Sequence, residues 1–166
     1  YTLPTGDRLH RRTKSYDDRC PSCHGPNETD DHILQCNAPA RRAWRSDLLN
    51  TLLKPLDAFV DPVLLDIFQE GLLRFFGDDH MDPSIYPPRY QRLLKQQSAI
   101  GWNNLLRGKL SEDWAYLQQQ YCIQHNIKMN HTQRLWLSKL LRTMWIRIHD
   151  LWLARNNDRH PYSLSS

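Results

Sequence analysis

The sequence predicts an all-α fold, a helical bundle preceded by a small module at the N-terminus. From residue 38 onward, apolar residues recur at helical intervals between recognisable helix starts and stops. Before residue 38 this periodicity is missing, and a segment rich in Pro, Gly, Asp and Arg holds most of the cysteines, so we expect loops there. No segment alternates cleanly enough to be a strand, although short pieces near those cysteines stay open.

Residues 38–76 are expected to form two helices. The first has Pro39 in its first turn, where the missing N–H of a proline is harmless. The second has a clear start, with Asp61 as N-cap and Pro62 at the first helical position, and Gly77 is a natural stop. Apolar residues continue at helical spacing along both segments: Trp44, Leu48, Leu49, Leu52 and Leu53, then Leu64, Leu65, Phe68, Leu72 and Phe76.

The segment 78–88 contains three Pro and three Asp, which predicts a loop. Helical patterning resumes over 90–100, and Gly101 and Gly108 interrupt it. Ser111 is followed by two acidic residues, which predicts another helix start because acidic side chains in a first turn suit the helix dipole.

The last helix is expected to be the longest, over 131–156. One face carries a stripe with alternating steps of four and three: Leu137, Leu141, Met144, Ile148 and Leu151. Trp136, Ile146 and Leu153 lie on other sides, so this helix should be central to a bundle or should also contact a partner. Arg155 is in phase with the stripe, either as a snorkelling side chain or in a buried salt bridge to an acid of the middle region.

Charge is distributed unevenly along the 166 residues. Eight Lys/Arg and seven Asp/Glu give residues 1–50 a charge of +1, three and seven give 51–90 a charge of −4, and eleven and four give 91–166 a charge of +7. No stretch approaches the roughly 18 apolar residues of a membrane-spanning helix, and the start has no apolar signal-peptide core. The chain begins at Tyr1 rather than Met, and we expect it to be a fragment of a longer protein.

Four residues stand at metal-ligand spacing. Two residues separate Cys20 from Cys23, so one turn brings both thiolates to the same side of an ion, and three residues separate His32 from Cys36, which places that pair on one face of a helical turn. Three sulfurs and one imidazole suit tetrahedral Zn²⁺ and leave no position for water, so we predict one structural zinc ion. Such an ion would contribute on the order of 10 kcal/mol to a segment with few large apolar side chains.

Other interpretations of these residues remain open. The cysteines could be free, or His24 could replace His32, although a side chain adjacent to Cys23 would have to turn back to reach the ion. Disulfides are disfavoured because nothing signals secretion, and the distant Cys122 is most simply a small buried residue. Three acids are candidates to accept a hydrogen bond from the ring N–H of His32, or are simply solvated: Glu28, Asp30 and Asp31.

This motif resembles the zinc-binding region that follows the reverse transcriptase in non-LTR retrotransposons. The resemblance is carried by Cys20-Pro-x-Cys23, Glu28-Thr29, His32, Cys36, Arg42 and Trp44. The upstream Leu3-Pro4-Thr5-Gly6-Asp7-Arg8-Leu9 is similar to the lead-in of such elements in algae and other protists, and Trp152-Leu153-Ala154-Arg155-Asn156 with His160 is similar to their Trp-x-x-Arg-Asn segment. Related elements often have four residues between the histidine and the last cysteine, where this chain has three.

The resemblance implies the tail of an RNA-directed DNA polymerase, which helps to hold template RNA or target DNA during target-primed reverse transcription. Its partners would be RNA or DNA and the reverse transcriptase domain of the same polyprotein, in the nucleus or in a cytoplasmic ribonucleoprotein. The fragment itself is expected not to be an enzyme, because the sequence lacks the polymerase's catalytic acidic motif and a nuclease constellation. The acidic loop Asp78-Asp79-His80 with Asp82 could bind a metal, although such loops are usually solvated.

Basic residues flank the predicted zinc ligands on both sides. If zinc brings the two flanks together, they would face phosphates from one side; the alternative is an ordinary solvated surface. Tyr16 and Trp44 are candidates for base stacking, although Trp44 is in phase with Leu48 and fits the core better. The predicted nucleic-acid contacts are Arg8, Arg11, Arg12, Lys14 and Arg19 before the ligands, and Arg41, Arg42 and Arg45 after them.

The sequence therefore predicts two parts, a Cys-Cys-His-Cys zinc-binding module over 1–45 and a helical domain over 46–166 with a loop near 77–88. The predicted function is non-catalytic nucleic-acid binding. The alternative is a zinc-supported protein-interaction module without direct nucleic-acid contact, which the excess apolar surface of the last helix favours.

Overall fold

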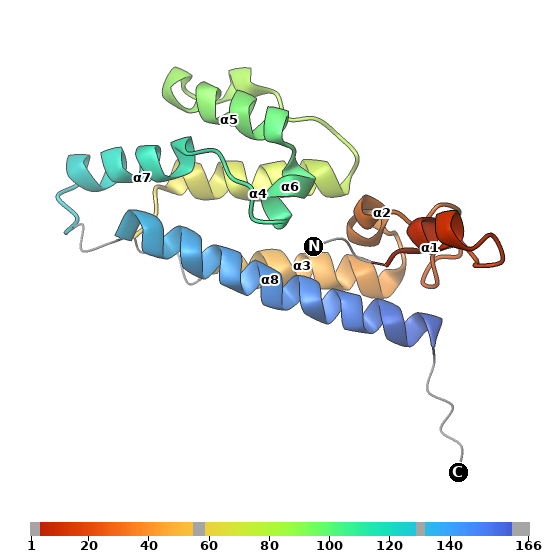
Figure 1. Ribbon diagram of the computed structural model, residues 1–166. Coiled ribbons are helices and arrows are strands. Elements are labelled where there is room, and N and C mark those ends of the chain that lie inside the picture. The colour runs from red at the N-terminus through yellow and green to blue at the C-terminus, as the bar shows by residue number, and fades with distance from the viewer. Residues whose placement is uncertain (1–3, 55–58, 129–131, 161–166) are drawn as a thin grey trace, which may run out of the picture. The chain divides into compact units, whose positions relative to one another are not determined.

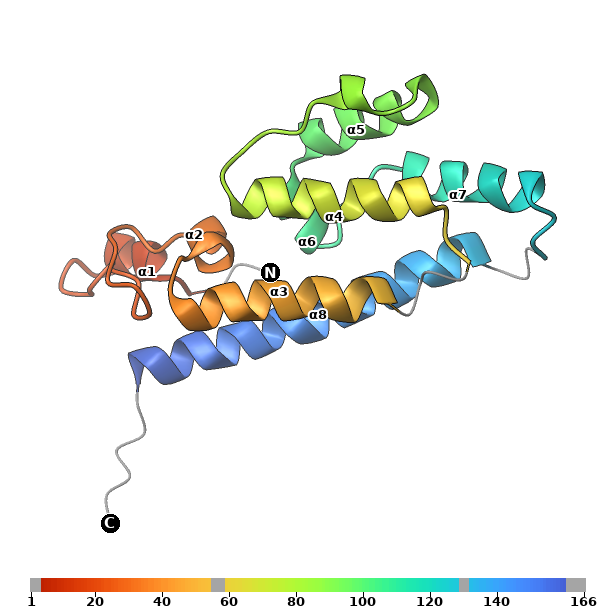
Figure 2. The same cartoon turned by 180° about the vertical axis from the view of Figure 1, so that it is seen from behind.

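The computed structural model describes residues 4–54, 59–128 and 132–160, with side chains of the last range from residue 135 (Figure 1, and from behind in Figure 2). All regular structure in these ranges is helical and none of it is strand, which confirms the predicted all-α class. The elements are α1 (Gly6–Arg12), α2 (Asp30–Gln35), α3 (Pro39–Leu53), α4 (Pro62–Phe76), the 3₁₀ turn η2 (Pro83–Ile85), α5 (Pro88–Ile100), α6 (Trp102–Leu106), α7 (Asp113–Gln124) and α8 (Thr132–Arg159).

The chain forms two compact units. The first comprises residues 1–46 and 147–166, and the second comprises residues 47–146. Helices α3 and α8 therefore contribute to both units. The sequence-based division at residue 45 assigns the whole of the last helix to the helical domain, whereas the contacts group its C-terminal end with the N-terminal segment.

Trp114 is the centre of the second unit. Its side chain is fully buried, and it makes edge-to-face ring contacts with Phe68 at 6.0 Å and with Trp102 and Trp136 at 6.4 Å between ring centroids. The indole N–H donates to Oε1 of the fully buried Gln97 at 3.0 Å, which satisfies its one polar atom. One aromatic residue thus joins α4, α6, α7 and α8 within this unit.

The predicted start of α4 is confirmed and has a second role. Asp61 accepts from the N–H of Val63 at 2.9 Å, as an N-cap does. The same carboxylate accepts from the Tyr90 hydroxyl at 2.5 Å, and the Asp61 N–H donates to Gln118 Oε1 at 2.9 Å, so the cap also ties α4 to α5 and α7. Burial and the neighbouring Asp61 carboxylate raise the pKa of Tyr90 to about 12, and this hydroxyl therefore stays a donor.

The predicted apolar stripe of the last helix is wrong by about one position over its first half. Leu137 and Leu141 are only half-buried, as is Ile148 further along. Met144 and Leu151 are buried as predicted, and the other buried apolar side chains of this helix are Trp136 and Leu140. The reason is that this helix is apolar on several sides, so spacing alone could not show that Trp136 is the residue that fills the core against Trp114.

Short helices are the main elements that the sequence pattern missed. Residues 1–37 are expected to be loops apart from a helical turn at His32 and Cys36, but α1 lies within them and α2 extends from Asp30 to Gln35. Gly101, at φ 101°, does separate α5 from the five-residue α6, as expected of an interrupting glycine. Neither α1 nor α6 is long enough to show a hydrophobic period.

Gly71 of α4 provides a test of this packing. A Cβ built there would lie 2.1 Å from the Trp102 indole of α6, inside any van der Waals contact. We predict that Gly71→Ala lowers the free energy of unfolding by about 2 kcal/mol, measured by urea denaturation followed by circular dichroism.

Gly77 is the matched control, because a Cβ there lies 3.5 Å from its nearest neighbour and its φ is −88°. If the new methyl group did not clash with Trp102, Gly71→Ala would instead raise the free energy of unfolding by about 0.5–1 kcal/mol, because alanine is preferred to glycine in a helix interior. The sign of the change in the free energy of unfolding therefore distinguishes the two cases. A Gly71→Ala protein more stable than the parent would show that α4 and α6 do not approach this closely.

Candidate metal centre

The first two candidate ligands lie on a tight loop between α1 and α2. The Cys20 N–H donates to the Gly25 carbonyl at 2.8 Å, and the His24 N–H donates to the Cys20 carbonyl at 2.8 Å, so the loop closes on itself. His24 takes a left-handed φ of 61° to make this turn. The Gly25 N–H then donates to Cys23 Sγ at 3.4 Å, which holds that thiol inside the loop beside Cys20.

The second pair of ligands lies on the six-residue helix α2. The Thr29 hydroxyl caps this helix by accepting from the His32 N–H at 3.0 Å. His32 is in the first turns and Cys36 is the C-cap residue, four positions later, so both side chains leave the helix on the same face. This is the arrangement that their spacing predicts.

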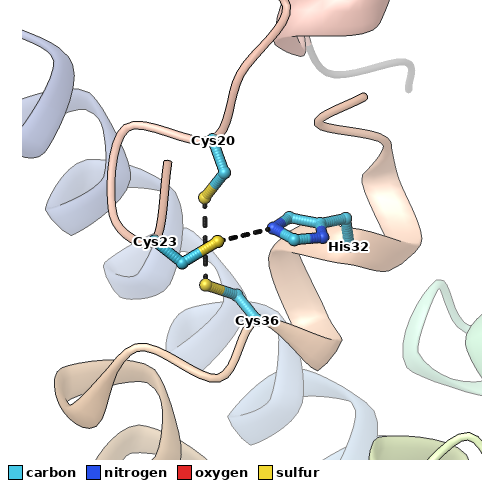
Figure 3. Close-up of side chains that lie close together, drawn as sticks. All are labelled: Cys20, Cys23, His32 and Cys36. Atoms are coloured by element: carbon cyan, nitrogen blue, oxygen red, sulfur yellow. Dashed lines mark hydrogen bonds between the residues drawn. The ribbon is translucent and has the colours of Figure 1, made fainter. Parts of the chain in front are cut away.

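The four side chains converge on one point (Figure 3). Their ligand atoms all lie within 4.8 Å of one another, with 3.8 Å between Cys20 Sγ and Cys36 Sγ and 3.3 Å between Cys23 Sγ and His32 Nε2. A disulfide needs an S–S distance of about 2.05 Å, so these cysteines are free thiols. Zinc–sulfur bonds of about 2.3 Å place the sulfurs of a tetrahedral site roughly 3.8 Å apart, so this cluster has the size to hold such an ion.

The close approach of the thiols and the imidazole, together with their burial, shifts the pKa of Cys20, Cys36 and His32. Burial opposes ionisation of Cys20, but hydrogen bonds from the His32 ring and from backbone N–H groups lower its pKa to about 6. Burial raises the pKa of Cys36 to about 12, and the neighbouring Cys20 thiolate adds to this effect. The hydrogen bond to Cys20 raises the pKa of His32. Without a cation between them, Cys20 and Cys36 therefore do not ionise together.

A buried ion pair fastens the loop between the two ligand pairs. Glu28 is fully buried and accepts from Arg155 Nε at 2.8 Å, from Arg155 Nη2, and from the Gly6 N–H at 2.7 Å. Arg155 is 3% exposed, and its guanidinium also lies over the Trp152 ring at 4.8 Å. The salt-bridge interpretation of Arg155 is thus confirmed. Its partner Glu28 lies in the segment 20–36 that carries the four candidate ligands, which we call the metal loop, and not in the middle region.

Two further residues of α8 hold the same loop. Asp158 accepts from the Ser22 hydroxyl at 2.7 Å and from Arg41 Nη2 at 2.5 Å, so a residue between the two loop cysteines is joined to α3 and α8. Arg159 donates to the Asp17 carbonyl at 2.7 Å, just before the loop. These contacts explain why the end of α8 belongs to the first unit.

Two of the predicted nucleic-acid contacts are buried. Arg41 is 4% exposed and is hydrogen-bonded to Ser22 and Asp158. Arg45 is 8% exposed and donates to the Leu34 and Cys36 carbonyls at 3.0 and 2.7 Å, where it satisfies the C-terminal end of α2. These two arginines hold the metal loop in place, and their burial removes them from the predicted phosphate-facing surface.

The other six predicted contacts are more accessible. Arg8 is half-buried in an ion pair with Asp30 at 2.7 Å, whereas Arg19 is exposed and paired with Asp17. Arg11 is exposed and paired with Asp7. Among the described residues of the first unit, three exposed cations have no ion pair: Arg12, Lys14 and Arg42.

The two candidate stacking residues both have structural contacts. Tyr16 is half-buried with the Arg159 guanidinium 5.1 Å from its ring centroid, so one face of its ring is covered. The Trp44 indole donates to the Arg147 carbonyl at 2.9 Å, joining α3 to α8. In the acidic loop, Asp79 pairs with Arg74 and Asp82 accepts from the Ser84 N–H, so both carboxylates have local partners.

The ion pair of Glu28 with Arg155 generates a stability prediction. Arg155→Met removes the cation that is hydrogen-bonded to the buried Glu28 and leaves only Arg159, whose Nη1 lies 4.0 Å from Glu28 Oε2. The substitution should therefore lower the free energy of unfolding of the first unit by up to about 3–5 kcal/mol. The matched control is Arg11→Met, which breaks an exposed pair with Asp7 and should cost about 0–1 kcal/mol. Equal effects of the two substitutions in urea denaturation would show that Glu28 and Arg155 do not anchor this unit.

No relative of this chain was found among known proteins. The chain matches no protein-family model, no curated protein and no solved structure. Among the described residues, no helix combines the length and the apolar character needed to cross a membrane. The molecule is thus characterised by its own geometry, an all-α chain with a Cys₃His cluster that could hold a metal ion.

Proposed function

We propose that Cys20, Cys23, His32 and Cys36 bind one structural Zn²⁺ ion and that the unit around them is a non-catalytic nucleic-acid-binding module. The observation that carries the proposal is the convergence of four donors within 4.8 Å. Thiolate and imidazole ligands favour zinc over the oxygen-seeking Mg²⁺ and Ca²⁺. Four protein donors fill a tetrahedral shell, so the ion would support the fold rather than activate water.

The first unit needs such support because its N-terminal part buries few apolar side chains. Between residues 4 and 38, the buried apolar residues are two of the candidate ligands themselves and three others: Cys20, Ile33, Leu34, Cys36 and Ala38. So small a core cannot offset the conformational entropy of the segment. Zinc binding would contribute on the order of 10 kcal/mol to the folding of this segment. The ion pair of Glu28 with Arg155 would then fix the folded segment to α8.

Nucleic acid is the proposed partner because five exposed cations belong to the same unit as the cluster. Arg12, Lys14 and Arg42 are exposed, and Arg11 and Arg19 are exposed beside single carboxylates. The resemblance to the region after the reverse transcriptase of non-LTR retrotransposons favours RNA or target DNA as the ligand. On this proposal the chain is the tail of an RNA-directed DNA polymerase, acting beside that domain in the nucleus or in a ribonucleoprotein.

A protein-interaction module is the second candidate. It is favoured by exposed apolar side chains on α8, where Trp145 and Ile146 are each more than half exposed and Leu135 is 48% exposed. The two candidates differ in what removing surface cations of the first unit does to RNA binding.

Metal content tests the zinc proposal directly. Elemental analysis of the purified protein should find one zinc per chain, and Cys36→Ala should lose it together with the structure of residues 4–38. The control is Cys122→Ala, which removes a buried cysteine outside the cluster and should keep the zinc. Amide hydrogen exchange after chelation should show lost protection in the first unit and retained protection in α4, α5 and α7.

A chain that contains no zinc yet keeps full protection in residues 4–38 would contradict the proposal. So would a Cys122→Ala protein that loses the metal as readily as Cys36→Ala.

RNA binding tests the second half of the proposal. Filter binding of a single-stranded RNA oligonucleotide should weaken with salt, and the triple variant R12A/K14A/R42A should reduce the slope of log K against log salt by about 2. The triple variant K95A/K109A/K128A removes as many exposed cations from the second unit and should leave the slope nearly unchanged. No binding at low salt, or equal losses in the two variants, would favour the protein-interaction module.

A further inference from the structure

An apolar groove lies in the second unit and shares no residue with the candidate metal centre. It has a volume of about 450 Å³ and is formed by the end of α3, the residues before α4, one residue of α7 and the first half of α8. Its walls are mainly apolar, with contributions from Leu52, Phe59 and Leu135, and Phe59 is 61% exposed. A groove of this size accommodates a few large side chains.

An exposed row on α8 continues from the groove. Leu135, Lys139, Arg142 and Ile146 follow one another in steps of four, three and four, so they lie in line on the helix surface. The first three line the groove, and Ile146 extends the row beyond it. At a rise of about 1.5 Å per residue the row is roughly 16 Å long, which exceeds a small-molecule site and suits about three turns of a partner helix.

The row is positively charged without compensation from its own helix. No acidic residue occurs between Thr132 and Ile146, and no acidic side chain lines the groove. Lys139 and Arg142 are both exposed at its rim. A helix with an apolar stripe flanked by Asp or Glu would therefore match this surface in both apolar pattern and charge.

Trp136 lines the groove and carries a buried, unsatisfied donor. This residue is only 6% exposed, and its indole N–H has no acceptor among the described residues. Buried donors are almost always paired in folded proteins.

We propose that this groove, together with the Leu135–Ile146 row, docks an acidic amphipathic helix of a partner protein. Apolar side chains of that helix enter the groove beside Phe59 and Leu135, and its carboxylates pair with Lys139 and Arg142. A second copy of the chain is disfavoured as the occupant, because a symmetric pair would bring the same cations face to face. Nucleic acid is disfavoured because the groove is mainly apolar.

The test uses two synthetic helical peptides with the same leucine stripe, one flanked by glutamates and the other by lysines. Fluorescence anisotropy with the zinc-loaded full chain should show binding of the glutamate peptide and none of the lysine peptide. The charge-reversed K139E/R142E protein should bind the glutamate peptide at least about tenfold more weakly and should gain affinity for the lysine peptide. Leu135→Ser should weaken glutamate-peptide binding several-fold without changing its salt dependence.

The control variant is K95E/K109E, which makes the same charge change at exposed sites of the second unit outside the groove. It should bind the glutamate peptide as the parent does. Equal binding of both peptides, or equal losses in the two charge variants, would overturn the proposal. It would also be overturned if K139E/R142E abolished binding of single-stranded RNA but not of peptide, or if sedimentation showed a dimer that Leu135→Ser dissociates.

Discussion

The convergence of three thiols and an imidazole is the constraint on which the first unit depends. These groups come from a loop and a one-and-a-half-turn helix that bury little apolar surface, and their atoms lie within 4.8 Å of one another. Thiols this close cannot all ionise without a cation, and a segment this poor in apolar contacts cannot hold them together by packing alone. A bound metal ion would resolve both problems with one set of bonds, which is why we propose a structural role for it.

Buried ion pairs connect the ligand-bearing segment to the C-terminal end of α8. Glu28 lies between the two ligand pairs, so the fold of the metal loop determines where its carboxylate meets Arg155. Arg41 and Arg45 have similar roles, because one is joined to Asp158 and the other covers the carbonyl end of α2. Basic residues near such a centre therefore divide by burial. The buried ones hold the ligand-bearing segment in place, and the exposed ones are the candidates for contact with the proposed nucleic acid.

The sequence was sufficient to predict those features that a short local pattern determines on its own. The ligand spacing, the Asp61 cap with Pro62, and the stops at Gly77 and Gly101 are local features, and the structure has each of them. It was insufficient where several faces of a helix are apolar, as in α8, since only the tertiary neighbours of Trp136 decide which face is buried. It also could not give the partner of Arg155, because Glu28 is 127 residues away and sequence distance carries no signal of the contact.

X-ray absorption spectroscopy at the zinc edge of the purified full chain tests the central claim most directly. We predict a four-coordinate site with three sulfur ligands at about 2.3 Å and one nitrogen ligand at about 2.0 Å, and no oxygen from water. A site with two sulfurs and oxygen ligands, or with a variable number of ligands, would contradict a closed structural centre built from Cys20, Cys23, His32 and Cys36.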